Sequence, residues 1–166
     1  MSNIKIINTG GTFNKIYDEI KGQLIVPKSN FAITDIIEKY LRNNFETALK
    51  GMLFKDSLEM TDDDREEICL EIKDSSKILI IHGTDTMNQT AQYIFDKYKD
   101  EKTVVLTGAM KPYSIDKTEA TSNFVQGLTF LNETEKKGVF ICMHGLNKKH
   151  DEIYKNRELG KFECQK

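Results

Sequence analysis

The feature that most restricts the fold is a short, nearly uninterrupted apolar run at residues 77–83, Lys-Ile-Leu-Ile-Ile-His-Gly. A strand with one face in water alternates apolar and polar side chains. A uniformly apolar strand is instead typical of a parallel sheet that is covered on both faces. Parallel strands are joined by crossover connections, usually helices. The run therefore favours an α/β domain whose mainly parallel sheet lies between two layers of helices.

Strand and helix patterns alternate along the chain, as such a domain requires. Further strands are predicted at residues 4–7, 52–54, 103–106 and 138–143. Apolar side chains at helical spacing predict helices at residues 33–41, 87–98 and 120–131. Another helix is predicted to start at Thr61, a capping hydroxyl followed by three aspartates. Thr86 and Gln89 fit a capping box at the start of the helix at residues 87–98.

Two segments lack these patterns. Residues 13–30 show no periodicity of helix length, so we expect a mobile excursion with a small hairpin around residues 24–26. The tail after His144 is charged, and we expect it to be less regular. We expect residues 1–166 to form a single domain, which their number suits.

Charge and hydropathy exclude several classes of function. The chain has 24 basic and 26 acidic side chains, so it lacks the positive excess that nucleic-acid binding needs. Its apolar runs are too short to span a bilayer. Residues 1–5 lead directly into a strand pattern without a secretory apolar core. We expect a cytoplasmic protein that binds neither nucleic acid nor membrane.

The three cysteines are widely spaced, and no CxxC or Cys/His cluster occurs. A structural zinc site is therefore not expected. Cys69 falls in a helical pattern and Cys142 in a strand pattern, so both are interpreted as small core residues. Cys164 is expected to be a free thiol.

Three predicted strands end in turns rich in glycine and threonine, at residues 9–12, 82–86 and 107–112. The carboxyl ends of parallel strands share one edge of a sheet, and ligands bind in the crevice there. Glycines allow close approach of the backbone, and threonines present hydroxyls. Phosphate binding is a rival interpretation, but neither GxGxxG nor GxxxxGK[ST] is present. A nucleotide site would rest on analogy of fold alone.

These turns also hold the groups needed for amide hydrolysis. A hydroxyl is a poor nucleophile unless a neighbouring base or polarising donor assists it. The oxyanion that forms on an attacked amide is stabilised by N–H donors, which glycine turns and helix starts supply. Two threonines held near an acid and a lysine would form such a catalytic set.

The turn sequences resemble the motifs of the bacterial-type L-asparaginase (asparaginase/glutaminase) family. Thr-Gly-Gly-Thr at 9–12, His-Gly-Thr-Asp-Thr-Met at 82–87 and Thr-Gly-Ala-Met-Lys-Pro at 107–112 occur in the family's order with compatible separations. The resemblance implies a three-layer α/β/α fold with a mixed, mainly parallel sheet, like the family's amino-terminal domain. Ordinary members carry a second α/β domain, which we expect to be absent here.

The resemblance also implies an activity, the release of ammonia from L-asparagine or a related side-chain amide. Thr12 matches the threonine nucleophile, and Thr84 the second catalytic threonine. Asp85 and Lys155 complete a relay with Thr84. Tyr17 is the candidate for the lid tyrosine that supports the nucleophile, although its spacing from Thr12 is shorter than in many members.

The candidate substrate-binding residues are Gly11, Ser57, Gly83, Thr84 and Asp85. By resemblance, Ser57 binds the substrate α-carboxylate and Asp85 its α-ammonium. Leu58 stands where several members have a polar side chain that contacts substrate. No metal or organic cofactor is expected. Because a neighbouring subunit helps complete the pocket in the family, we expect a homodimer or a higher homo-oligomer.

Simpler roles compete with these assignments. A strand-end threonine can merely cap a helix, and Asp85 can be an acid at a helix start. Lys155 lies in a charged tail with other lysines, at positions 148, 149 and 161. His82 is interpreted as a structural hydrogen-bonding residue and Lys111 as a turn residue. A non-catalytic amino-acid-binding or partner-subunit domain is the alternative to an enzyme.

Overall fold

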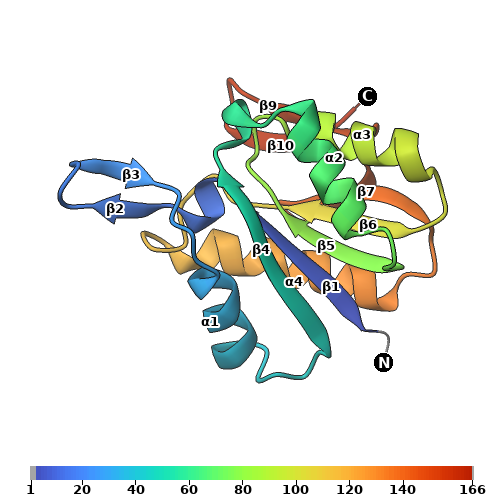
Figure 1. Cartoon of the computed structure of the whole chain (residues 1–166), viewed down its shortest axis with the longest axis horizontal. Helices are drawn as coiled ribbons and strands as arrows, with labels where there is room; N and C mark the ends of the chain where they lie inside the picture. Colours follow the sequence, from blue (N-terminus) through green and yellow to red (C-terminus); the bar gives the residue numbers. More distant parts are fainter. Residues whose placement is uncertain (1–2, 166) are drawn as a thin grey trace.

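A computed structural model describes residues 3–165 of the chain. Its centre is a six-stranded sheet in the order β4-β1-β5-β6-β7-β8 (Figure 1). These strands are β1 (Ile4–Gly10), β4 (Thr47–Lys55), β5 (Lys77–Ile81), β6 (Thr103–Thr107), β7 (Gly138–Met143) and β8 (Leu146–Lys149). All neighbouring pairs are parallel except β7 and β8. The predicted mixed, mainly parallel sheet is confirmed.

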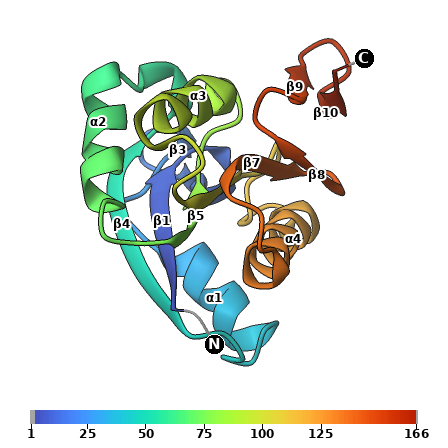
Figure 2. The same ribbon diagram turned by 90° about the vertical axis from the view of Figure 1, so that its right-hand side faces the viewer.

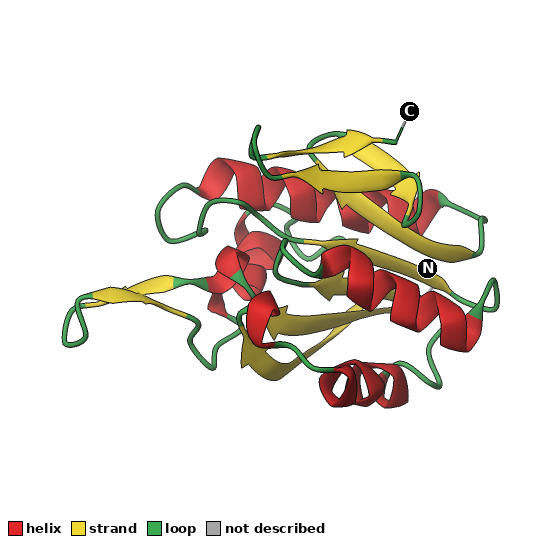
Figure 3. Cartoon of the chain, turned by 90° about the horizontal axis from the view of Figure 1, so that it is seen from above, coloured by secondary structure: helices red, strands yellow, loops and turns green. Residues whose placement is uncertain are grey.

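Helices cover both faces of the sheet (Figures 2 and 3). They are α1 (Phe31–Lys39), α2 (Asp62–Glu71), α3 (Met87–Tyr98) and α4 (Lys117–Glu133). One core cluster joins α1 and α4 to the sheet, and the other joins α2 and α3 to it. Along β5, Leu79 packs in the first cluster and Ile80 in the second. Both faces of this strand are therefore buried, which is why its sequence is uniformly apolar.

The start of α2 confirms the predicted cap at Thr61. Its hydroxyl accepts a hydrogen bond from the backbone N–H of Asp64 at 3.3 Å, and the Asp64 carboxylate accepts one from the Thr61 N–H at 2.8 Å. This reciprocal pair satisfies two donors that the first helical turn leaves open. Lys55, at the end of β4, also contacts the Asp64 carboxylate at 2.8 Å. The cap therefore links α2 to the sheet edge.

The predicted capping box of Thr86 and Gln89 is wrong. The Thr86 hydroxyl donates instead to the backbone carbonyl of Ser57 at 2.8 Å, and no side-chain bond caps α3. The Gln89 side chain accepts a 3.5 Å hydrogen bond from Arg65. The Thr86 hydroxyl thus bonds to a distant turn and not to the first turn of its own helix. A local sequence pattern does not reveal such a distant partner.

The tail is more regular than predicted. After β8, the strands β9 (Ile153–Asn156) and β10 (Lys161–Cys164) form an antiparallel hairpin. Ile153 and Phe162 anchor this hairpin in the core cluster of α2 and α3. Most other side chains in the tail face solvent, so its sequence is polar although its backbone is ordered into strands.

The excursion after β1 contains the predicted hairpin, formed by β2 (Ile16–Asp18) and β3 (Gln23–Ile25). It projects from the body of the domain (Figure 1). The short 3-10 helices η1 (Thr12–Asn14) and η2 (Ser57–Glu59) follow β1 and β4. Cys69 and Cys142 are buried and Cys164 is an exposed free thiol, as predicted. Within residues 3–165, no helix has the length and apolar character needed to cross a bilayer.

Candidate active site

The carboxyl ends of β1 and β5 meet at a cluster of closely packed backbone. A Cβ placed on Gly11 would lie 2.5 Å from Cα of Gly83, and one on Gly83 would lie 2.5 Å from Cβ of Ser57. Gly11 also has φ of +74°, a conformation that favours glycine. Only glycine fits at both positions. The residues that follow them, Thr12 and Thr84, are thereby brought to the same edge of the sheet.

Lys155 joins the second strand end from far along the chain. Its Nζ donates hydrogen bonds of 2.8 Å to Oγ1 of Thr84 and of 2.8 Å to Oδ1 of Asp85. Thr84 is only 5 % exposed, and the Lys155 side chain is 14 % exposed. An ion pair with this little solvent is screened less than one at the surface. The arrangement links a hydroxyl, an amine and a carboxylate, which together can carry a proton.

A second cation lies on the outer side of Asp85. Nη2 of Arg157 is 3.7 Å from Asp85 Oδ1 and donates a 3.4 Å hydrogen bond to the backbone carbonyl of Asp85. Arg157 is largely exposed, so its contribution is that of a surface contact. It was not predicted from the sequence, because no local pattern relates it to a residue 72 positions away.

Ser57 has a buried hydroxyl without a partner. The residue is 1 % exposed, and its Oγ makes no hydrogen bond within the described part of the chain. Burying a hydroxyl without a partner costs about 1–3 kcal/mol. This hydroxyl lies against Gly83, at the turn that follows β5. Leu58, the next residue, is 67 % exposed.

Asp56, which precedes Ser57, stays ionised. Burial alone raises the pKa of this carboxyl, but hydrogen bonds from Lys15 and the Leu58 N–H, with the nearby charge of Lys155, lower it overall. Nζ of Lys15 lies 2.8 Å from the carboxylate. Lys15 follows η1, so this ion pair ties the Thr12 segment to the Ser57 segment.

Thr12 lies at the start of η1 and is half-buried. Among the described side chains, its hydroxyl has no hydrogen bond to Thr84, Asp85 or Lys155. The segment is held by Asn14, whose Nδ2 donates to Asn8 Oδ1 at 2.8 Å and to the Gly10 carbonyl at 2.7 Å. This buried asparagine pair was not predicted from the sequence. A polar residue inside the apolar strand β1 was the available signal.

Among the described residues, Tyr17 makes no hydrogen bond to another candidate site residue. It lies on β2 in the projecting hairpin, with 62 % of its surface exposed (Figure 1). Its role as a lid tyrosine stays a prediction.

The remaining strand-end threonines have structural partners. The Thr9 hydroxyl donates to the Ile81 carbonyl at 2.8 Å, and the Thr107 hydroxyl donates to the Cys142 carbonyl at 2.8 Å. Both therefore join neighbouring strands. Lys111 is exposed, 3.9 Å from the carboxylate of Asp116.

His82 is a buried residue behind the second turn. Its Nδ1 lies 2.7 Å from the Gly83 carbonyl, and its Nε2 lies 2.8 Å from the Thr90 hydroxyl. Burial disfavours the charged imidazolium and lowers the pKa of His82 to about 4. A neutral imidazole enclosed in this way holds the Gly83 turn. Within residues 3–165, no group of three or more His, Cys, Asp or Glu side chains is placed to hold a metal ion.

The molecule is thus an α/β domain with a Thr84–Asp85–Lys155 cluster at the carboxyl edge of its sheet. The family model described as "Asparaginase, N-terminal" matches residues 3–166. The chain therefore belongs to the asparaginase family, in the region that matches the family's N-terminal domain, which confirms the resemblance found in its motifs.

Individual relatives agree with this family. The chain is 29 % identical to a glutamyl-tRNA(Gln) amidotransferase subunit of Methanobrevibacter smithii, over 96 % of this chain and 38 % of that protein. It is 24 % identical to glutaminase-asparaginase of Acinetobacter glutaminasificans, over 96 % of this chain and 50 % of that protein. The thermostable L-asparaginase of Thermococcus kodakarensis shares the fold, with a TM-score of 0.81 and 23 % identity over 98 % of this chain and 51 % of that one. The chain spans about half or less of each relative.

Proposed function

We propose that this domain is an amidohydrolase that releases ammonia from L-asparagine or a related side-chain amide through a threonine nucleophile. The observation that carries the proposal is the pair of 2.8 Å hydrogen bonds from Lys155 to Thr84 and Asp85. This cluster adjoins a buried serine hydroxyl that has no partner within the described residues. A purely structural ion pair would not require an unsatisfied hydroxyl next to it.

In the proposed reaction, Oγ of Thr12 forms a bond to the amide carbon. The Thr84–Lys155–Asp85 set takes up the proton that Thr12 loses and delivers it to the leaving nitrogen. The carbon–nitrogen bond then breaks, ammonia departs, and water hydrolyses the acyl-threonine ester to the carboxylic acid. Backbone N–H groups of the glycine turns are suited to stabilise the oxyanion.

The proposed substrate contacts use the remaining candidates. Ser57 donates to the α-carboxylate, and Asp85 accepts from the α-ammonium. Gly11 and Gly83 allow the substrate to approach the backbone. We further propose a cytoplasmic protein whose cleft is completed by another copy in a homodimer or larger homo-oligomer. The exposure of Leu58 beside Ser57 supports an incompletely covered cleft.

The test is ammonia release from L-asparagine and L-glutamine by the purified chain. Turnover should be abolished in Thr12→Ala and in Thr84→Val, with folding intact by circular dichroism. Thr12→Ser keeps a hydroxyl and serves as the matched control, so it should retain measurable turnover. Unchanged turnover in both Thr12→Ala and Thr84→Val would remove the proposed nucleophile and relay.

A second candidate function is supported by the relatives named as amidotransferase subunits. In that case the domain acts as a partner subunit or an amino-acid-binding module without turnover of its own. Thermal stabilisation by L-asparagine or L-glutamine in the absence of ammonia release would favour it. Loss of that stabilisation in Ser57→Ala would locate the ligand. Stabilisation by a nucleotide instead would favour a phosphate site.

A further inference from the structure

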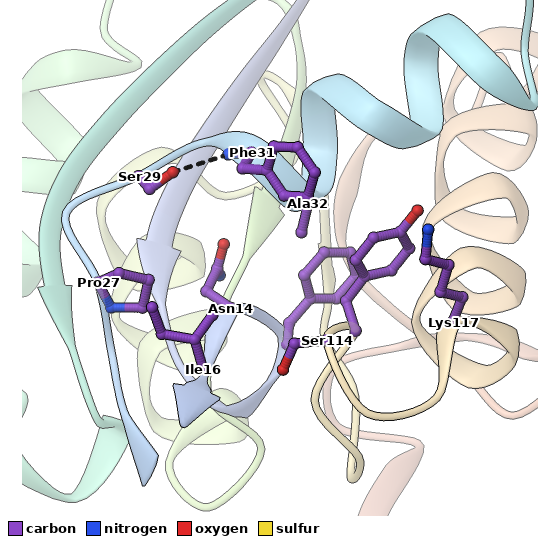
Figure 4. Close-up of a pocket in the computed structure, with 10 residues that line it drawn as sticks. Asn14, Ile16, Pro27, Ser29, Phe31, Ala32, Ser114 and Lys117 are labelled. Atoms are coloured by element: carbon purple, nitrogen blue, oxygen red, sulfur yellow. Dashed lines mark hydrogen bonds between the residues drawn. The ribbon is translucent and has the colours of Figure 1, made fainter. Parts of the chain in front are cut away.

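A separate cavity of about 410 Å³ lies at the base of the β2–β3 hairpin (Figure 4). Its apolar walls come from η1, the chain on both sides of the hairpin, the start of α1 and the loop before α4. They comprise Phe13, Ile16, Pro27, Phe31, Ala32 and Tyr113. Pockets of about 300–1,000 Å³ with apolar walls and few polar groups are typical of small-molecule sites. None of the proposed catalytic or substrate-binding residues lines it.

Among the described residues that line this cavity, Lys117 is the one with a charged side chain. Asp35, which contacts Lys117, also pairs with Lys39, whose Nζ is 2.6 Å away. Hydrogen bonds from Lys39 and the Tyr113 hydroxyl lower the pKa of Asp35 to about 2, so it is fully ionised. Asp116, beside the start of α4, is 3.9 Å from Lys111. Lys117 therefore shares the single charge of Asp35 with Lys39.

Lys117 is placed to use this charge at the cavity. It is one of the lining residues, and its Nζ lies 5.2 Å from the centre of the Tyr113 ring. Its contact with Asp35 is longer, at 3.4 Å, and half of the lysine side chain is exposed. Figure 4 shows Lys117 at one end of the cavity and Ile16 with Pro27 at the other. The site is apolar along its length and cationic at one end.

A helix start and two serine hydroxyls also lie at this cavity. Helix α1 begins at the cavity, and the positive end of a helix favours an anion, whereas the start of α4 is already capped by the Asp116 carboxylate. The Ser114 hydroxyl donates to the Lys15 carbonyl, and the Ser29 hydroxyl accepts from the Phe31 N–H. Ser29 therefore keeps its own proton for a further acceptor.

We propose that this cavity binds a small amphipathic carboxylate, whose apolar body fills the space between Phe13, Phe31 and Tyr113 and whose charged group contacts Lys117. Burial of the body supplies the binding energy, and the ammonium supplies the selection for an anion. The proposal does not depend on amide hydrolysis.

The test is a titration of the full chain with 3-phenylpropionate as probe. Amide chemical shifts in two-dimensional NMR spectra report the binding. Saturable shifts are expected at the amides of Phe13, Ala32 and Ser114. The uncharged analogue 3-phenyl-1-propanol should bind about tenfold more weakly, the factor that corresponds to about 1.4 kcal/mol. The titration should give the same result in the Thr84→Val variant, which separates it from the proposed amidase.

Variants at Lys117 measure how much its positive charge contributes to binding of the carboxylate. Lys117→Met should weaken binding of the carboxylate about tenfold and leave binding of the alcohol unchanged. Lys117→Arg should retain the preference for the carboxylate. Lys148→Met makes the same charge change on β8, outside the cavity, and should have no effect.

Three results would overturn the proposal. The first is equal binding of the carboxylate and the alcohol, or no saturation with either. The second is a set of shifts confined to Thr84, Asp85 and Lys155, which would place the probe in the candidate active site. The third is self-association that shifts the cavity amides without any probe, since a second copy of the chain would then occupy the space.

Discussion

The role of Lys155 depends on its tertiary environment more than on its sequence context. Its sequence context is a charged tail that contains several lysines, yet it is only 14 % exposed and contacts both Thr84 and Asp85. Lys161, on the paired strand β10, is half-exposed and contacts Glu163. Two lysines of one hairpin thus have different environments, and only one of them can contribute to the proposed chemistry.

This difference gives a paired prediction for activity. Lys155→Met removes the amine from the relay and should lower kcat by about 10²–10⁴-fold, the range for a lost general acid–base group. Lys161→Met removes an equal charge from the same hairpin and should leave kcat within about twofold. Steady-state ammonia release measures both. Equal losses in the two variants would indicate a charge effect of the hairpin rather than a relay.

His82 gives a prediction for the pH dependence of stability. Its pKa is about 4 in the folded chain, against 6.5 for an unperturbed histidine. Between these values the unfolded chain binds a proton that the folded chain does not, so stability falls as pH falls. The His82 contribution should be complete above pH 6.5 and should decline by about 3 kcal/mol on acidification to about pH 4.

The measurement compares urea unfolding of the wild type and His82→Gln across this window. Other acids and histidines titrate in both proteins and cancel in the difference. The advantage of the wild type over the variant should shrink as pH falls. A difference independent of pH would show that His82 does not change its proton affinity on folding.

At the scale of elements, local sequence signals were reliable where local partners decide the structure. Thr61 caps α2 through a residue three positions away, and that bond was predictable. Thr86 presented the same kind of signal, but its hydroxyl bonds to a carbonyl 29 residues away. The two threonines differ because a tertiary partner is within reach of only one of them.

The cap of α2 provides a stability prediction. Thr61→Ala removes the hydroxyl that accepts from the Asp64 N–H and should lower the free energy of unfolding by about 1 kcal/mol. Thr61→Ser keeps the hydroxyl and should lower the free energy of unfolding by only a few tenths of the loss in Thr61→Ala. Chemical denaturation of both variants at neutral pH checks the prediction. A loss of the same size in Thr61→Ser would assign the effect to the lost methyl group.

At the scale of the whole molecule, the sheet is the common wall of two separate core clusters. Leu79 packs among α1 and α4, whereas Ile80 packs among α2 and α3. The same sheet presents Thr84 and Ser57 at its carboxyl edge. The cores therefore fix the frame on which the candidate site is built.

A core substitution tests this dependence. Leu79→Ala should lower the free energy of unfolding by about 2–5 kcal/mol, because a fully buried side chain is replaced by a cavity. Leu70→Ala makes the same change at an exposed position of α2 and should change stability by less than about 0.5 kcal/mol. Denaturant midpoints measured side by side distinguish the two. Similar losses would contradict the assignment of Leu79 to the core.

The sequence by itself determined the α/β class, most of the strands and helices, and the motifs at the strand ends. Periodicity and capping are local properties, so a single chain displays them. It predicted an irregular tail, because solvent-exposed strands carry polar side chains like those of a loop. It also did not reveal the asparagine pair of Asn8 and Asn14.

Only the tertiary structure decided which of these residues come together. The contact of Lys155 with Thr84 spans 71 residues, and the unpartnered Ser57 hydroxyl is recognisable only once its described neighbours are in place. The cavity beside Lys117 arises where three separate segments meet. Such contacts form because packing brings distant segments together, and no pattern within one segment encodes the partner.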